Sequence, residues 1–470
     1  MKIQTIGDNA MVKLIHGERF TPFSLCSKLG AKALLESASF EQGRGRYSIL
    51  LVREAFSVFE KEEGPFIRKD GRDAPLQPRG RDILDCLLAI ADQHACADRR
   101  FPCPSGGVGY LAYDYALRFD DIRAETKPDF LGIPDAHFVF GHVFLIFDHY
   151  NDTIAILGLN YDESRIDLPG AIAETEERIN DLDFNYLIEP SRSYDAALLV
   201  KDGDRERFVE GVEKMRKEIV KGNLLQGVLS RRAYVRSEIP ALEAYRRLRS
   251  LNPSPYMFYL DLGNFQLFGA SPEIHVKSDG EKVVIRPLAG TRRRGQTKRE
   301  DEILEAELRA DVKEKAEHLM LVDLARNDLG RVSRTGSVRV SRSMDIERYA
   351  YVMHLVSQVE GELAPGMTGI DAIRATFPAG TVSGAPKIRA MEIISSLEKE
   401  KRGFYAGLVG YIEPGGTLDT CITIRSALKS DDVLVLQAGA GIVYDSVAER
   451  EYAETSAKLE AMSRTLGVEV

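Results

Sequence analysis

The sequence has no tryptophan and few cysteines, although its 470 residues include 18 tyrosines and 20 phenylalanines. A chain of this length with 44% hydrophobic residues can bury a large core without disulfides. The cysteines are Cys26, Cys86, Cys96, Cys103 and Cys421. They have neither the paired spacing of a zinc site nor the density of a disulfide-rich domain, so we expect reduced cysteines that mainly pack in the interior.

Long hydrophobic runs and an excess of positive charge are also missing. No apolar stretch reaches the roughly 20 residues that span a bilayer, and the first segment, MKIQTIGDNAMVKLIHGERF, lacks the hydrophobic part of a signal peptide. The formal net charge of −9 argues against a general nucleic-acid surface. We therefore predict a globular cytoplasmic protein that binds neither membranes nor nucleic acid, while a local site for a small anion stays possible.

Several motifs of other enzyme classes are absent or incomplete. The GAG of Gly439–Gly441 lacks the third glycine and the distant acid of a dinucleotide fingerprint. In Gly380–Gly384, GTVSG, the serine stands one position later than in the nucleophile elbow of hydrolases. The chain has no G-x-x-x-x-G-K-[ST] loop and no H-E-x-x-H. Rossmann, hydrolase, kinase and zinc-enzyme interpretations therefore have no motif to support them.

Carboxylates beside apolar helical stripes are the first positive feature. In Lys315–Gly330, KAEHLMLVDLARNDLG, Glu317 lies next to a stripe with helical spacing, and Gly330 is expected to end the helix. A charged group beside a buried stripe is costly unless something pairs with it, and a divalent cation is one candidate. The stripe consists of Leu304, Leu308, Val312, Ala316 and Leu319.

A second such helix is predicted near the C-terminal end. Ser446 and Glu449 have the spacing of a capping box, which predicts a helix from about Val447 to Gly467. Periodicity alone leaves open whether its charges form ordinary surface ion pairs or share a metal with the first helix. The charged row along the edge of its apolar face is Glu451, Glu454 and Lys458.

The order of predicted elements favours an antiparallel sheet with later helices. From Phe23 to about Asp162, short β-rich runs alternate with turns. We expect helices over 173–184 and 205–221 and a polar linker over 190–204. After the second helix, strands and long helices alternate to the end of the chain.

Several phrases resemble one enzyme family in order along the chain. They are HLMLVDLARNDLG, FPAGTVSGAPKIRAMEII, GLVGY, DTCITIRSA and QAGAGIVYDSVAEREYAET. They resemble the chorismate-utilising enzymes, most closely the anthranilate synthase component I branch, and the likeness runs from about Leu34 to Met462. The resemblance implies a single α+β body of two large packed antiparallel β-sheets with helices outside. It also implies a tryptophan-binding regulatory element in 1–190 and a chorismate-binding catalytic region in 200–465.

The implied reaction is Mg²⁺-dependent amination of chorismate at C2 by ammonia, followed by loss of pyruvate to give anthranilate. By resemblance, Glu317 and Glu454 hold the Mg²⁺, which prefers hard oxygen ligands and an anionic substrate. Glu273 in GASPE is then the acid that protonates the departing hydroxyl, because hydroxide leaves badly. His354 is expected to act in the second step by proton transfer or positioning.

The implied substrate contacts include one arginine and several small residues. Arg425 is expected to fork onto a substrate carboxylate, which a planar guanidinium does better than lysine. Backbone amides of the GAG segment can approach an anion closely. The full set is Gly290, Thr291, Tyr405, Arg425, Gly439, Ala440, Gly441 and Lys458, with Thr291 also counted as catalytic.

Two positions separate branches of the family. Branches that attack with water resemble one another in a basic lysine where this chain has Gln226, and aminodeoxychorismate synthases use a lysine nucleophile where it has Ala289. A glutamine beside C2 suits ammonia, which already carries a free lone pair. The alternatives are an aminodeoxychorismate synthase component I and a non-catalytic regulatory subunit of the same fold. The latter predicts damaged metal or acid positions, which this sequence does not have.

The resemblance also implies an inhibitor and a partner. LLES and PSPYM are similar to a tryptophan-binding element made by Glu36, Ser37, Pro255, Tyr256 and Met257. None of the cysteines lies in the glycine-flanked elbow of a glutaminase. We therefore expect a separate glutaminase subunit to supply ammonia.

Overall fold

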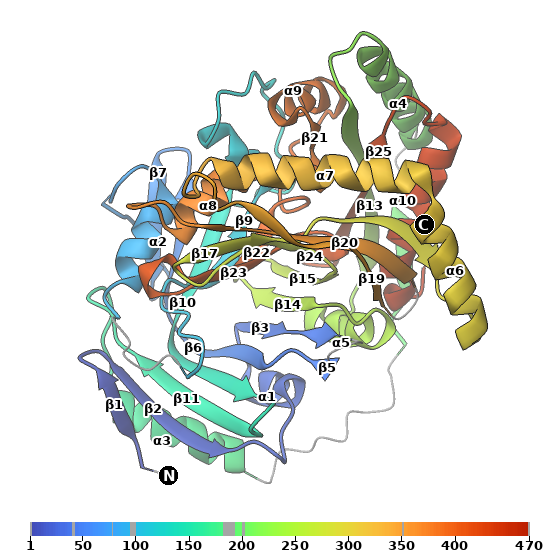
Figure 1. Ribbon diagram of the computed structural model, residues 1–470. Helices are drawn as coiled ribbons and strands as arrows, with labels where there is room; N and C mark the ends of the chain where they lie inside the picture. Colours follow the sequence, from blue (N-terminus) through green and yellow to red (C-terminus); the bar gives the residue numbers. More distant parts are fainter. Residues whose placement is uncertain are drawn as a thin grey trace.

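Antiparallel strands form the centre of the molecule. The computed structural model describes residues 2–39, 43–77, 79–94, 100–181, 193–199, 203–349 and 352–468 (Figure 1), so Cys96 lies outside the described residues. In this part of the chain, pairing joins 23 strands into one sheet, and β4 and β5 form a separate pair. This confirms the predicted α+β class.

The strands fall in two groups along the chain. The first group is β1 (Gln4–Gly7), β2 (Ala10–His16), β3 (Ala33–Glu36), β4 (Ala38–Ser39), β5 (Gly43–Arg44), β6 (Tyr47–Lys61), β7 (Gly64–Lys69), β8 (Arg72–Pro75), β9 (Val108–Leu111), β10 (Ala136–Asp148) and β11 (Thr153–Leu159). The second group is β12 (Ala196–Leu199), β13 (Gln226–Ser237), β14 (Tyr256–Asp261), β15 (Gln266–Ser271), β16 (Ile274–Ser278), β17 (Lys282–Ile285), β18 (Leu288–Arg293), β19 (Arg339–Arg348), β20 (Val352–Glu362), β21 (Gly384–Ala385), β22 (Leu408–Ile412), β23 (Leu418–Ile422), β24 (Ser426–Ser430) and β25 (Val433–Ile442).

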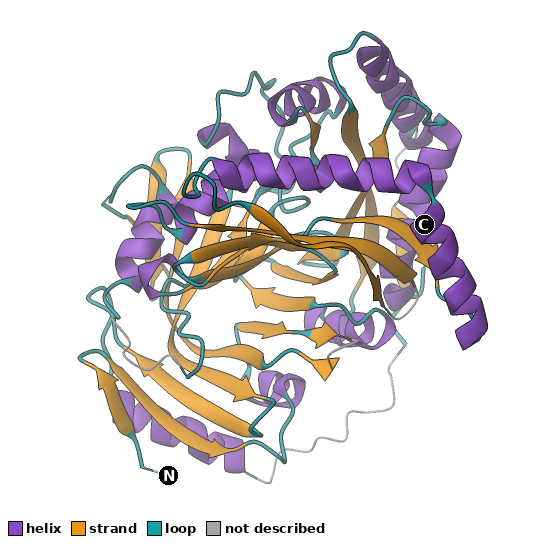
Figure 2. Ribbon diagram, in the orientation of Figure 1, coloured by secondary structure: helices purple, strands orange, loops and turns teal. Residues whose placement is uncertain are grey.

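Helices surround these strands (Figure 2), and no helix of the described residues is both long and apolar enough to cross a membrane. The longest, α7, packs on β18 and β20. The helices are α1 (Pro22–Leu29), α2 (Ile83–Ala91), α3 (Leu168–Asn180), α4 (Asp204–Val220), α5 (Ala241–Leu251), α6 (Lys298–Ala310), α7 (Val312–Gly330), α8 (Gly369–Thr376), α9 (Lys387–Leu397) and α10 (Ala448–Ser463).

The apolar stripe predicted to run through one helix is divided between two. The side chain of Asp311 accepts hydrogen bonds from Lys313 N and Glu314 N, so it ends α6 and caps α7. After this break the stripe leaves the core, because Val312 is 81% exposed and Leu319 is 51% exposed. The buried face of α7 is made instead by His318, Leu321, Val322, Ala325 and Leu329.

Two local predictions near other helices were also wrong. The helix α10 begins as expected, but Ser446 does not cap it, since its Oγ accepts from Val443 N at 3.0 Å. The predicted linker over 190–204 contains a strand, because Ala196–Leu199 pairs with Tyr234–Ser237 of β13. Residues 190–192 and 200–202 lie outside the described residues.

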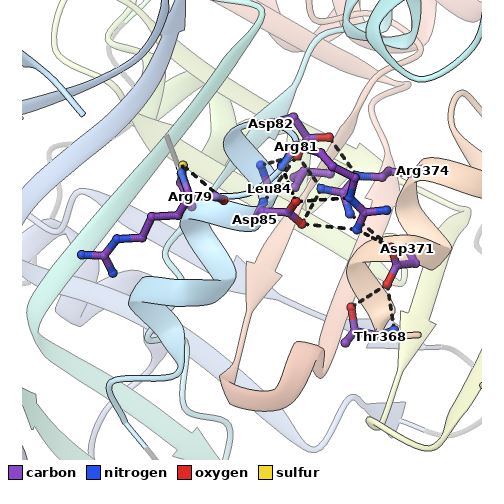
Figure 3. Close-up of polar contacts among 9 residues, drawn as sticks. Arg79, Arg81, Asp82, Leu84, Asp85, Thr368, Asp371 and Arg374 are labelled. Atoms are coloured by element: carbon purple, nitrogen blue, oxygen red, sulfur yellow. Dashed lines mark hydrogen bonds and ion pairs between the residues drawn. The ribbon is translucent and has the colours of Figure 1, made fainter. Parts of the chain in front are cut away.

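Strands from the first and second groups pair directly. In the sheet, β3 lies between β6 and β14, and β9 lies between β10 and β22. A partly buried ion cluster joins the first and second parts of the chain (Figure 3): Arg374 of α8 donates to Asp82 and Asp85 at the start of α2, at 2.5 and 2.6 Å. Arg81 and Asp371 complete this cluster. The two halves therefore share both their sheet and their core.

Candidate functional site

Neighbouring strands bring a threonine and a histidine together. In the β18–β20 pair, Thr291 lies opposite His354, and Thr291 Oγ1 is 3.1 Å from His354 Nδ1. The same nitrogen is 3.0 Å from Gly290 O, which can only accept, so Nδ1 carries the proton and Nε2 has the free lone pair. Burial lowers the pKa of His354 to about 4, and the imidazole is therefore neutral.

A buried carboxyl group precedes β16. Glu273 is 6% exposed, and burial raises its pKa to about 8. The Leu288 N–H and the Thr381 hydroxyl are the two polar groups that oppose this shift. The Thr381 hydroxyl is itself buried and satisfies no hydrogen-bond geometry within the described residues. Glu273 thus keeps its proton at neutral pH, as a general acid requires.

Cationic and phenolic side chains gather at the end of β25. Lys458 Nζ donates to Gly439 O at 2.8 Å and pairs with Glu454 at 2.7 Å. A Cβ on Gly439 would lie 2.8 Å from Tyr405 Oη, so glycine permits this contact. Arg425 is partly buried and has a φ of 51°. Burial lowers its pKa, and the neighbouring Tyr405 and Glu454 act in the opposite direction. Within the described part of the chain it pairs with no carboxylate, which leaves its charge available to an anion.

The start of β13 faces the GAG segment of β25. The register places Val228 opposite Gly441 and Leu229 opposite Ala440. A Cβ on Gly441 would lie 2.6 Å from Gln226 Nε2. Glycine at this position therefore lets the Gln226 amide lie over the strand that is expected to hold the substrate.

Carboxylates from α7 and α10 face one another. The pKa of Glu317 is raised, first by burial and also by Glu314 and Glu451, and burial and Glu454 raise the pKa of Glu451. Lys313 lies 3.8 Å from Glu317. In the described residues no three acidic, histidine or cysteine side chains form a complete metal cage. A hard cation with water and substrate as further ligands fits this set, because it would relieve the repulsion between the half-buried carboxylates of Glu317 and Glu451.

A cavity of about 500 Å³ lies at the seam between the halves of the chain. The five residues expected to bind the inhibitor all line it: Glu36, Ser37, Pro255, Tyr256 and Met257. The carboxylate of Glu36 is held by Tyr245 Oη at 2.8 Å and by Arg249 at 2.9 Å. The cavity is separate from the groups around Glu273 and His354, although Ile274 and Tyr349 of its wall adjoin them.

Two residues of this site were missed from the sequence. Thr381 stands in the GTVSG segment, whose serine drew attention only as a failed nucleophile elbow. Glu451 was noticed on the edge of its helix but was not assigned to the metal. Local patterns could not single them out, because their roles depend on contacts with Glu273 and Glu317 from distant segments.

Comparison with known proteins places the chain in a family. The chain belongs to the family described as chorismate binding enzyme, which matches residues 41–464. It is 57% identical to anthranilate synthase component 1 of Spirochaeta aurantia, over 98% of this chain and 96% of that protein. It is 40% identical to anthranilate synthase component 1 of Aquifex aeolicus, over 95% and 92%. The crystal structure of anthranilate synthase component I from Streptococcus pneumoniae superposes with a TM-score of 0.80 at 37% identity, covering 89% of this chain and 92% of that one.

Proposed function

We propose that this chain is the large subunit of an anthranilate synthase, which aminates chorismate at C2 with ammonia and then eliminates pyruvate. The observation that carries this proposal is that Tyr349 lies between two buried groups, being 5.4 Å from the neutral His354 ring and close to the carboxyl of Glu273, whose pKa is raised to about 8. Arg425, which has no carboxylate partner in the described residues, acts on the same histidine. The full-length similarity to anthranilate synthase component 1 proteins supports the same reaction.

Glu273 supplies the proton for the first step. Ammonia forms the new C–N bond at C2, the ring double bonds shift, and the C4–O bond breaks as the departing hydroxyl takes the Glu273 proton and leaves as water. The new ammonium group then releases its extra proton to water. A carboxyl with an ordinary pKa would be ionised at neutral pH, and the raised pKa of Glu273 keeps the acid form available.

His354 serves the second step. Its Nδ1–H is engaged by Gly290 O, so Nε2 is the nitrogen that can accept the C2 proton as the C–O bond to the enolpyruvyl group breaks. The enolpyruvate that leaves takes up a proton at its methylene carbon to become pyruvate, and the ring becomes aromatic. Thr291 fixes the plane of the imidazole through its contact with Nδ1.

The anionic groups of chorismate are bound by three side chains and by the backbone amides of the GAG segment. The side chains are those of Arg425, Lys458 and Tyr405. Glu317 and Glu454, with Glu451 beside them, would hold Mg²⁺. When bound, Mg²⁺ neutralises and orients the substrate carboxylate.

Product analysis tests the branch. With chorismate, Mg²⁺ and ammonium at alkaline pH, chromatography should give anthranilate as the main product, because Gln226 and Ala289 replace the lysines of the water-using and aminodeoxychorismate branches. Isochorismate or 4-amino-4-deoxychorismate as the chief product would overturn the assignment.

The ammonia source is a separate cytoplasmic glutaminase subunit, since the chorismate-binding match occupies residues 41–464 and the described cysteines, Cys26, Cys86, Cys103 and Cys421, are buried. The isolated chain should use ammonium and ignore glutamine, and the purified pair should use both. Glutamine-dependent anthranilate formation by the isolated chain would rule out this division of labour.

A further inference from the structure

A fully buried arginine joins the two walls of the proposed site. Arg402 is 2% exposed and lies among the largest buried side chains of the described residues. Its Nη1 donates to Val382 O at 2.8 Å, and its Nη2 donates to Val228 O at 2.6 Å. One guanidinium therefore binds two backbone carbonyls from segments that are far apart in the sequence.

A buried glutamate completes the junction. Glu398 accepts from Arg402 Nε at 2.8 Å and from its Nη2 at 2.7 Å. The same carboxylate accepts from the backbone and the hydroxyl of Ser230, each at 2.8 Å. Arg402 and Glu398 thus fix strand β13 at two positions, Val228 and Ser230.

The segments that Arg402 joins carry groups of the proposed site. Val382 directly follows Thr381, which lines the same small cavity as Glu273, and the Thr381 hydroxyl lowers the pKa of Glu273. Val228 lies two positions beyond Gln226, whose amide lies over Gly441. Arg402 is therefore hydrogen-bonded to the backbone one residue from Thr381 and two residues from Gln226.

We propose that Arg402 is a positioning residue. It holds Thr381 beside Glu273 and holds the segment of β13 that carries Gln226, so that the acid and the ammonia that attacks C2 are kept at a fixed separation. This inference rests on the proposed function. Arginine suits the task because its planar fork reaches both carbonyls and the Glu398 carboxylate at once, whereas a lysine ammonium is a single point charge.

Other ionisable groups near Glu273 are few in the described residues. Tyr349 is close enough that Glu273 contributes to its raised pKa. His275 and Asp328 line the small cavity of about 30 Å³ beside Glu273. His275 is neutral because burial lowers its pKa to about 3, and Asp328 is paired with Lys387 at 2.7 Å. The Thr381 hydroxyl is thus the side-chain contact that lowers the pKa of Glu273.

The test is the Arg402→Lys variant, assayed for anthranilate formation across a pH series at constant free NH₃. We expect kcat to fall about 10- to 100-fold, as for a displaced catalytic group, with KM for chorismate changed less than about threefold. The basic limb of kcat, which lies near pH 8 in the parent, should move to higher pH because Glu273 loses the contact that lowers its pKa.

Arg374→Lys is the matched control, since this arginine also forks onto partners shielded from solvent in part, but it lies in the ion cluster with Asp82 and Asp85. It should lower stability without moving the basic limb. If Arg402→Lys does not fold, the double variant Arg402→Met with Glu398→Met removes both buried charges together, which proteins often tolerate. That variant should fold and show the same loss of kcat and the same shift of the limb.

The outcomes separate the two proposals. Parent enzyme that forms no anthranilate refutes the proposed function. If the parent enzyme forms anthranilate, three results for the Arg402 variants refute the positioning role alone. These results are an unchanged kcat, a rise in KM only, or a loss of kcat without a shift of the basic limb.

Discussion

Replacing Glu273 by glutamine should separate activity from stability. The amide keeps the shape of the carboxyl group but cannot donate a proton to a leaving hydroxyl. Loss of a positioned general acid lowers rates by about 10²- to 10⁴-fold, so we expect a fall of kcat in this range. Binding of chorismate should change little, because Glu273 acts on the leaving group rather than on the substrate anions.

The stability effect has the opposite direction and follows from burial. The pKa of Glu273 is raised from its ordinary value near 4.5 to about 8 in the folded state. The stability associated with this group is therefore complete below pH 4.5 and is lost as the pH rises through the folded pKa. At about 1.4 kcal/mol per pKa unit, the loss amounts to about 5 kcal/mol above pH 8. A neutral glutamine does not titrate and should not show this loss.

Urea unfolding at pH 5 and pH 9 measures the difference. Relative to the parent, Glu273→Gln should gain about 4 kcal/mol of unfolding free energy between these pH values. Glu62→Gln, on an exposed turn, is the matched control and should change neither activity nor this difference. Equal pH dependence of stability in Glu273→Gln and the parent, or retention of full kcat, would refute the assignment of a buried, protonated acid.

Other predictions address the metal, the inhibitor and the ion cluster. Glu317→Gln and Glu454→Gln should each abolish turnover and weaken Mg²⁺ binding in calorimetry while the circular dichroism spectrum is unchanged, and full activity in either would contradict the metal site. Ser37→Phe should fill part of the 500 Å³ cavity and relieve inhibition by tryptophan without reducing uninhibited activity; a parent enzyme indifferent to millimolar tryptophan would count against this. Arg374→Met leaves Asp82 and its neighbours with one cation fewer and should lower the unfolding free energy by about 3–5 kcal/mol, so a change below about 1 kcal/mol in urea unfolding would show that the cluster is dispensable.

Much of the fold could be predicted because its strands have clear local patterns. The β-rich stretch predicted from Phe23 to about Asp162 contains the strands β3 to β11. The predicted linker failed because Ala196–Leu199 forms a short strand only by pairing with β13. The prediction of one continuous apolar stripe across Asp311 was wrong, because the spacing of apolar residues does not reveal that the Asp311 side chain caps a new helix.

The candidate site residues come from motifs that resemble those of the family, and their roles stay predictions. Among them, Arg425 lies near His354 and Glu454. Thr381, Glu451 and Arg402 were not predicted, because each acquires its role from partners more than 100 positions away or from a backbone carbonyl. A single sequence does not encode such contacts in any local pattern.

The pairing of β3 with β14 bears on the proposed inhibition by tryptophan, because it places both strands in the wall of the cavity. Glu36 and Met257 lie opposite each other in this pair, so the cavity at the seam has one wall from each half of the chain. A ligand that fills it therefore favours one relative placement of the two strands, and any substitution that slides β3 against β14 alters its affinity. Since binding free energies are reciprocal, a substrate that favours another placement must weaken the inhibitor equally. Tryptophan bound in the proposed cavity and chorismate bound at the proposed site should then weaken each other's binding in rate measurements.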